Sequence, residues 1–431
     1  MAGPNALSIR MYHVGFGDCF LLTFHYSTID RHLLIDFGTT RQSKEYMAKI
    51  ANDIKSRCNG KIDAVLVTHR HKDHLSGFKS DGSGASSGDI IASLKPDLVS
   101  MTWTEDPELD RTAIGPVQDD EKLSFVASLK SMERIAERSM VVAQTVKKEK
   151  RFAISSELED LSEINIANKS ALTSLLNMTK PKGDLEFLHN GSKTKLNPLF
   201  RGVKFHVLGP PTVDQWSKVK WQKSKDKNEY WHLANYWQLL ERSFEDGKSS
   251  SKLFAKRFIT KIPSSAKWLV DHMKDPTAVD LLRISRIMDN AINNTSIILV
   301  IELWGMKMLF PGDAQIESWD YVLNGPQAKR NRELLSDVEI YKVGHHGSLN
   351  ATPKTLWNLL INRKDKDGNG NLISLLSSRL NVHGKAKNGT EVPRHKLVKA
   401  LKKGSELIAA PYKTETKFKE LDYSDLEIEF N

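Results

Sequence analysis

Six consecutive residues constrain this chain more than any other feature. The segment His69-Arg70-His71-Lys72-Asp73-His74 directly follows a short apolar run, 63–68, which is typical of a buried strand. At the end of a strand, residues i and i+2 project to the same side, so His69 and His71 can converge on one ion. Asp73 and His74 follow in the turn and can face a second ion. Imidazole and carboxylate ligands favour zinc, with manganese and iron as alternatives.

Two later segments place further ligand-type side chains at predicted strand ends. Asp313 follows the apolar run 307–310, and the pair His345-His346 follows the apolar run 339–343. Each segment alone is weak evidence, because a strand-end aspartate often only forms a turn. Together with the first cluster, they predict a set of ligands that converges at one edge of a sheet.

The rest of the pattern predicts a mixed α/β chain with a long interruption. Residues 1–104 and 291–431 alternate strands and helices, whereas 105–290 are richer in helical patterns such as 123–148 and 156–176. We therefore expect an N-terminal half, 1–104, a mostly helical insertion, 105–290, with a core-like strand near 203–208, and a C-terminal half, 291–431. Strands are expected at 7–13, 19–25, 32–36, 63–68, 98–102, 295–302, 307–310, 339–343, 372–377 and within 406–430, and helices at 42–59 and 396–403.

The composition narrows the setting in which the chain works. Lys and Arg number 63 against 53 Asp and Glu, a net charge of +10, which favours a polyanionic partner such as nucleic acid. An ordinary solvated basic surface would give the same balance. Cys19 and Cys58 are the only cysteines, too few for a disulfide framework, so we expect a reducing cytoplasm. The chain has no apolar run of about 18 to 20 residues, which predicts that it has no membrane segment.

The motifs resemble those of metallo-β-lactamase fold hydrolases, whose pattern is His-x-His-x-Asp-His. Further local features resemble the branch that contains the hydrolase domain of bacterial competence (DNA-uptake) proteins. The resemblance covers residues 7–104, 203–211 and 290–403. It implies an α/β (α+β) fold, a four-layer αββα sandwich with the large helical insertion. The matching segments are Val14-Gly15-Phe16-Gly17-Asp18, Leu34-Ile35-Asp36-Phe37-Gly38, Asn294-Thr295-Ser296, Gly312-Asp313 and Lys342-Val343-Gly344-His345-His346-Gly347-Ser348.

The resemblance also implies roles for individual residues. His69 and His71 would hold one metal, and Asp73 and His74 the other. Asp313 would bridge the two, and one of His345 or His346 would complete the second site. We favour His345, which lies nearest the strand end. The family's third ligand to the first metal, a separate histidine, would have to come from His189, His206, His232 or His272, none of which has a recognisable context.

Two aspartates are expected to support these ligands from behind. Asp36 corresponds to the family's buried aspartate that orients the ligand loops. Asp18 is expected to help shape the site, although the turn Gly15-Phe16-Gly17-Asp18 alone would explain its presence.

The implied activity is hydrolysis by a metal-activated water, with Asp73 and His74 as the catalytic residues. Given the basic charge, we expect a phosphodiesterase or nuclease that acts on nucleic acid and uses Zn²⁺ or, alternatively, Mn²⁺, at up to two sites. One alternative is a hydrolase of a small-molecule ester, lactone or phosphoester. Another is a largely structural metal site in a component of a protein assembly, which would have partner proteins.

Several residues outside the motifs are candidates for substrate contact. Lys218, Lys220 and Lys223 lie beside Trp221, an arrangement that suits phosphate contact and base stacking but equally a solvated helix. His383 and His395 could approach the metals or a leaving group, or could simply lie on the surface.

Overall fold

The computed structural model describes residues 3–107, 169–212, 215–216, 292–348, 352–378, 391–410, 419–420 and 426–430. The chain divides into two compact units. One comprises Met1–Asp106, Ala167–Trp216 and Asn293–Asn431, and the other Pro107–Ile166 and Ser217–Ile292. Almost all of the second unit lies outside the described residues, so the fold below is that of the first unit.

The first sheet has eight strands and is mixed. Its strands from β13 to β3 pair antiparallel, whereas β3, β4, β5 and β6 pair parallel. Their order is β13 (Lys419–Glu420), β14 (Leu426–Phe430), β1 (Ala6–Met11), β2 (Cys19–His25), β3 (Asp30–Phe37), β4 (Ala64–Leu66), β5 (Leu98–Thr102) and β6 (Asp184–Leu188).

The second sheet has six strands and is also mixed. The strands β12 to β9 pair parallel, and β9, β8 and β7 pair antiparallel. Their order is β12 (Glu406–Ala410), β11 (Ile373–Ser377), β10 (Ile340–Lys342), β9 (Met306–Phe310), β8 (Ile298–Leu303) and β7 (Lys204–Gly209). Trp304 and Gly305 connect β8 to β9 with φ of 54° and 85°, as a tight two-residue hairpin turn requires.

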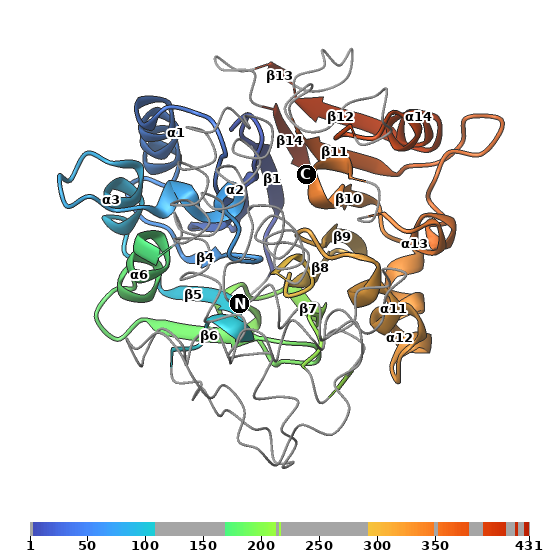
Figure 1. Ribbon diagram of the computed structural model, residues 1–431, viewed down its shortest axis with the longest axis horizontal. Helices are drawn as coiled ribbons and strands as arrows, with labels where there is room; N and C mark the ends of the chain where they lie inside the picture. The colour runs from blue at the N-terminus through green and yellow to red at the C-terminus, as the bar shows by residue number, and fades with distance from the viewer. Residues whose placement is uncertain are drawn as a thin grey trace, which may run out of the picture. The chain divides into compact units, whose positions relative to one another are not determined.

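Three apolar clusters hold these elements together. The first contains side chains of both sheets, such as Ile9 and Leu33 from one and Leu299 and Ile301 from the other, so the sheets pack on each other. Alternate strand residues point to opposite faces, which leaves each sheet a second apolar face. The second cluster packs helices on the eight-stranded sheet, namely α1 (Lys44–Arg57), α3 (Ser87–Ala92) and α6 (Lys169–Asn177). The third packs α11 (Ile316–Asn324), α12 (Ala328–Ser336), α13 (Lys354–Leu359) and α14 (His395–Gly404) on the six-stranded sheet (Figure 1).

The predicted elements recur with shifts of a few residues at their ends. The helix expected at 42–59 is α1, which begins after Ser43 because the Ser43 hydroxyl accepts a hydrogen bond from the Tyr46 amide at 3.2 Å. The helical pattern 123–148 lies outside the described residues.

One part of the predicted insertion, 105–290, clusters with the two halves. Residues Ala167–Trp216 belong to the first unit and supply β6 to one sheet and β7 to the other. Strand β7 was expected, but β6 was not. Glu186 of β6 can be buried because its carboxylate accepts hydrogen bonds from the Ser100 and Thr194 hydroxyls, both at 2.7 Å. A buried carboxylate of this kind interrupts the apolar pattern from which strands are predicted.

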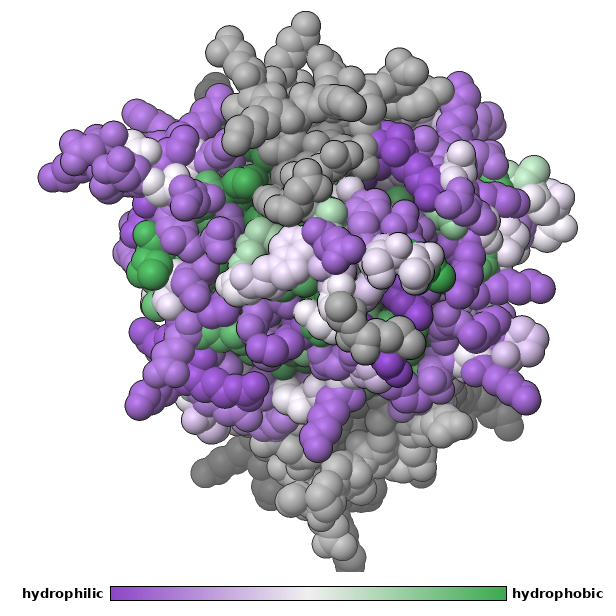
Figure 2. Space-filling view, turned by 180° about the vertical axis from the view of Figure 1, so that it is seen from behind, coloured by the Kyte–Doolittle hydropathy of each residue, from purple (hydrophilic) through white to green (hydrophobic). Residues whose placement is uncertain are grey.

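The face of the molecule seen in Figure 2 is largely hydrophilic where the residues are described. In the view of Figure 2, apolar areas are small and separated by polar side chains. The large apolar side chains that are exposed, Ile29, Trp304, Ile316 and Ile361, are scattered along the chain. No helix in the described ranges is long and apolar enough to cross a membrane.

Candidate metal centre

The histidine and aspartate motifs all lie just beyond the carboxyl ends of strands. After β4, the chain passes His69 and His71 and enters the short helix α2 (Lys72–Leu75), which carries Asp73 and His74. Asp313 follows β9, and His346 lies in the turn η5 (Gly344–Gly347) after β10. Strand β4 belongs to the eight-stranded sheet, and β9 and β10 to the other. The two sheets therefore both contribute side chains to one site.

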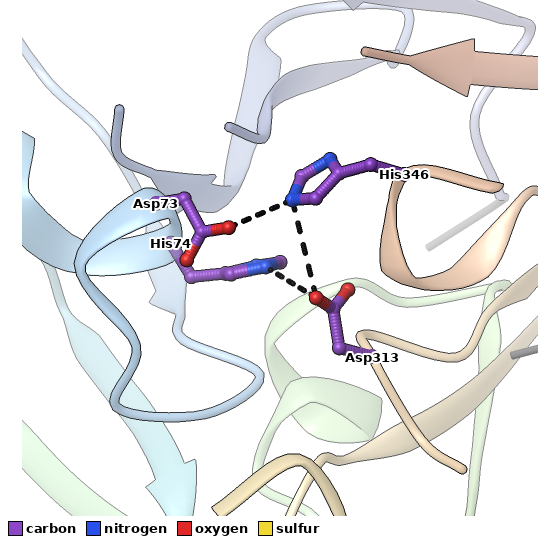
Figure 3. Close-up of side chains that lie close together, drawn as sticks. All are labelled: Asp73, His74, Asp313 and His346. Carbon is purple, nitrogen blue, oxygen red and sulfur yellow. Dashed lines mark hydrogen bonds and ion pairs between the residues drawn. The ribbon is translucent and has the colours of Figure 1, made fainter. Parts of the chain in front are cut away.

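Four of these side chains form a compact buried group. Each of Asp73, His74, Asp313 and His346 offers one ligand atom, and these atoms lie within 4.8 Å of one another. His346 Nε2 lies 2.8 Å from Asp73 Oδ2, and His74 Nε2 lies 3.2 Å from Asp313 Oδ2 (Figure 3). The distance from His346 Nε2 to Asp313 Oδ2 is 3.9 Å. We call these four residues the DHDH group.

The DHDH group fits a divalent cation. His74 Nε2 and Asp313 Oδ2 are buried and pair with each other at 3.2 Å, but neither atom forms a hydrogen bond elsewhere among the described residues. Two imidazole nitrogens and two carboxylates are a ligand set that zinc and manganese accept. A cation among these atoms could bind one atom of each of the four residues.

Both imidazoles of the group are oriented through their Nδ1 atoms. His74 Nδ1 lies 2.8 Å from Asp36 Oδ2, and Asp36 is itself fixed by the amide and hydroxyl of Thr68, at 2.7 and 2.8 Å. His346 Nδ1 lies 2.9 Å from the Ser377 carbonyl oxygen, which can only accept, so Nδ1 carries the proton. Such contacts leave Nε2 of each ring available as a ligand. Asp36 thus contacts His74 from the side opposite to Nε2.

His69 and His71 lie next to the DHDH group and close to each other. His69 Nε2 is 3.0 Å from His71 Nδ1, and the ring centroids of His69 and His74 are 4.2 Å apart. Burial lowers the pKa of His69 well below its usual value and that of His71 to about 4. Both rings are therefore neutral at pH 7, the state that a metal ligand requires.

The structure places His346, rather than the favoured His345, in the DHDH group. His345 contacts Asp313 through its backbone amide, which donates to Asp313 Oδ1 at 3.0 Å, while its Nε2 lies 4.0 Å from Asp313 Oδ2. Both residues have left-handed backbones, with φ of 42° and 51°. Nearness to the strand end therefore does not decide which ring points into the group.

The charges within the site stabilise one another. Burial opposes the charged form of His74, but Asp313, Asp36 and Asp73 outweigh it and raise the pKa of His74 well above its usual value, so a cation bound here would have to displace a proton from His74. Burial likewise opposes ionisation of Asp313, yet His74, His345 and Lys342 hold the pKa of that carboxyl well below its usual range. The pKa of Asp73 is also lowered, because His74 and His346 outweigh the effect of burial. Both carboxylates are ionised at pH 7.

Asp18 and Lys342 complete the charged interior. Asp18 is fully buried, and its Oδ2 forms an ion pair with the Nζ of Lys342. The sequence patterns assigned no role to Lys342, although its position indicates one. Lys342 ends the predicted buried strand after Ile340 and Tyr341, and a charged residue in a buried strand needs a partner of opposite charge.

Close backbone contacts set the position of helix α2. A Cβ atom added at Gly38, just after β3, would lie 2.4 Å from the backbone of Asp73 and of His74. The Asp18 amide donates to the Asp73 carbonyl oxygen at 2.9 Å, and the Gly38 amide to the Asp18 carbonyl oxygen at 3.1 Å. The loops after β1 and β3 therefore hold the helix that carries Asp73 and His74.

The other candidate residues are not brought into this group. His395 is exposed at the start of α14, and its amide lies 3.4 Å from Glu391. His206 lies on β7, 3.3 Å from Glu302, and His189 contacts the neighbouring Asn190 carbonyl oxygen at 2.9 Å. Residues that lie outside the described part of the chain are Lys218, Lys220, Lys223, His232, His272 and His383.

Comparison with known proteins adds no relative to this picture. No protein-family model matches the chain, and no curated protein is significantly similar to it.

Proposed function

We propose that this chain is a metal-dependent hydrolase of the metallo-β-lactamase fold, and that it cleaves phosphodiesters of nucleic acid. The observation that carries the proposal is the buried DHDH group at the ends of β4, β9 and β10. The three apolar clusters support the fold assignment. One cluster joins the two sheets, and each of the other two joins a sheet to the helices on its outer face, as in a four-layer sandwich.

In this proposal the DHDH group holds one Zn²⁺, with Mn²⁺ as an alternative. His69 and His71, neutral and adjacent, are the protein's ligands for a second ion. The chemistry that such ions supply is Lewis acidity, which polarises the ester and acidifies water. Asp73 has a lowered pKa, so it suits orienting a water by accepting its hydrogen bond better than removing its proton.

The preference for nucleic acid rests on charge. The net charge of +10 favours an anionic polymer over a neutral ester, and a phosphodiester is the electrophile that such a polymer offers.

The test combines metal analysis with cleavage assays of the purified full-length chain. Substrates are single- and double-stranded DNA and RNA and a chromogenic phosphodiester, each with Zn²⁺ or Mn²⁺. We expect Asp73→Ala and Asp313→Ala to lose bound metal and to lower cleavage by more than about a hundredfold, since even residues behind metal ligands are worth about 10–100-fold. Asp30→Ala is the matched control, because Asp30 is an exposed aspartate that pairs with His25 outside the DHDH group.

The other outcomes separate the competing functions. Cleavage of the chromogenic ester with every nucleic acid left intact would replace the polymer with a small-molecule substrate. Bound metal without any hydrolysis would favour a structural metal site within an assembly. Cleavage that survives both aspartate substitutions would refute the proposed site.

A further inference from the structure

A buried lysine lies directly behind the DHDH group. Lys342 ends β10, is 2% exposed, and donates a hydrogen bond to the Gly312 carbonyl oxygen at 3.3 Å. Its Nζ forms an ion pair with Asp18 Oδ2 and lies 3.6 Å from Asp313 Oδ1. Because a buried ammonium is costly unless it is paired, Lys342 must keep a carboxylate partner, and these two are the carboxylates beside it.

Asp313 turns its two oxygens toward different neighbours. Oδ1 accepts the His345 amide at 3.0 Å and faces Lys342. Oδ2 faces the Nε2 atoms of His74 and His346, at 3.2 and 3.9 Å. Only Oδ2 therefore points to the place where a cation would be held. A second positive charge drawn onto Asp313 would compete with that cation for the same carboxylate.

Asp18 is needed by Lys342 more than by the histidines. It lies 3.6 Å from His74 Nδ1 and 3.7 Å from His346 Nδ1. Both nitrogens have nearer partners, Asp36 at 2.8 Å and the Ser377 carbonyl oxygen at 2.9 Å. The contact between Asp18 and Lys342 is the closest that Asp18 makes among the described ion pairs.

We propose that Asp18 is a positioning residue that compensates the charge of Lys342 and holds its ammonium group closer to Asp18 than to Asp313, which keeps Asp313 Oδ2 available for a cation. This inference rests on the metal site of the proposed function. According to this inference, Asp18 and Lys342 affect the metal affinity of the site although neither of them binds the metal.

The experiment measures the Zn²⁺ affinity of the metal-free, full-length chain by competition with a chromophoric chelator. Asp18→Asn leaves Lys342 without its counter-charge, so we expect affinity to fall by at least about tenfold, the usual loss for partners behind metal ligands. The double variant Asp18→Asn/Lys342→Met removes both charges together, and we expect its affinity to return to within about threefold of the unmodified chain. Asp337→Asn is the matched control, since it removes the partner of Lys307 in an ion pair of 2.7 Å outside the site.

Each outcome supports or overturns the inference. A double variant that binds zinc as weakly as Asp18→Asn would show that Asp18 orients the histidines, and an Asp18→Asn chain with unchanged affinity would show that the pair is irrelevant to the metal. Circular dichroism checks that each variant folds. If Asp18→Asn alone does not fold, the double variant provides the test. A loss of zinc affinity of more than about tenfold in the folded double variant would contradict charge compensation. An unmodified chain that binds neither Zn²⁺ nor Mn²⁺ overturns the proposed function itself, and this inference with it.

Discussion

At the scale of single residues, the neighbours His345 and His346 contact the site in different ways, one through its backbone amide and the other through its ring. The His345 amide holds Asp313 Oδ1 at 3.0 Å, whereas the His346 ring reaches Asp73 at 2.8 Å. A left-handed backbone costs roughly 1–2 kcal/mol per residue for an L-amino acid, and two such residues follow each other here. The contacts with Asp313 and Asp73 offset this conformational free energy.

This difference predicts unequal effects of two equivalent substitutions. His346→Ala removes a ring of the DHDH group, so we expect zinc affinity to fall by at least about tenfold. His345→Ala keeps the backbone amide that holds Asp313, so we expect a loss of less than about threefold. Isothermal titration with Zn²⁺ measures both. A larger loss for His345→Ala would exchange the roles of the two histidines.

How well single residues could be predicted depended on whether their role follows from chain position. Asp73, His74 and Asp313 could be named because they follow apolar strands. The predicted convergence at one edge of a single sheet was wrong, because β4 and β9 belong to different sheets. The choice between His345 and His346 depends on two left-handed residues, which no hydrophobic pattern encodes. Lys342 was passed over because its partner, Asp18, lies more than 300 positions away in the sequence.

At the scale of elements, the site depends on how closely the loop after β3 packs on helix α2. Gly38 allows this contact, because a Cβ there would lie 2.4 Å from the Asp73 and His74 backbone. Strands flanking the site were predictable from continuous apolar runs, which are typical of buried parallel strands. Strand β6 was not predictable, because Glu186 is buried through hydrogen bonds from distant donors, Ser100 on β5 and Thr194 in the loop before helix α7 (Leu196–Leu199).

Gly38→Ala is therefore expected to damage both stability and metal binding. Overpacking of this kind costs about 1–3 kcal/mol of unfolding free energy, and the forced shift of α2 displaces Asp73 and His74. Gly60→Ala is the control, since Gly60 has a positive φ of 75° but nothing within 4 Å of an added Cβ. Urea unfolding and zinc titration of both variants are the measurements. We expect Gly60→Ala to lose stability only, and equal zinc affinities in the two variants would contradict the packing argument.

At the scale of the whole first unit, the DHDH group joins the two sheets. Asp73 and His74 follow a strand of the eight-stranded sheet, and Asp313 and His346 follow strands of the six-stranded sheet. The two-sheet arrangement was implied by the family resemblance alone, because the strand pattern predicted only one sheet edge for the ligands. The division of the chain could be anticipated only in part, because the contribution of Ala167–Trp216 to the first unit depends on packing between distant segments.

A cation that binds only the folded site should raise the melting temperature. At a free Zn²⁺ concentration one hundred times the dissociation constant, the gain is about 2.7 kcal/mol, and a chelator should reverse it. Differential scanning calorimetry with and without EDTA measures the effect. Asp73→Ala, which removes a member of the group, should abolish the shift. A melting temperature indifferent to zinc would mean that the ion does not bind the native fold.

The span of the DHDH group along the chain also sets when the centre can exist during biosynthesis. Asp73 and His346 are 273 positions apart. At about 5–20 residues per second, a ribosome needs roughly 14–55 s to add the second after the first. Until Asp313 is added, an ion on the nascent polypeptide could bind only Asp73 and His74 of the DHDH group, together with the neighbouring His69 and His71. The complete DHDH group can therefore form only after translation has passed His346 and the strand ends that carry its four residues have packed together.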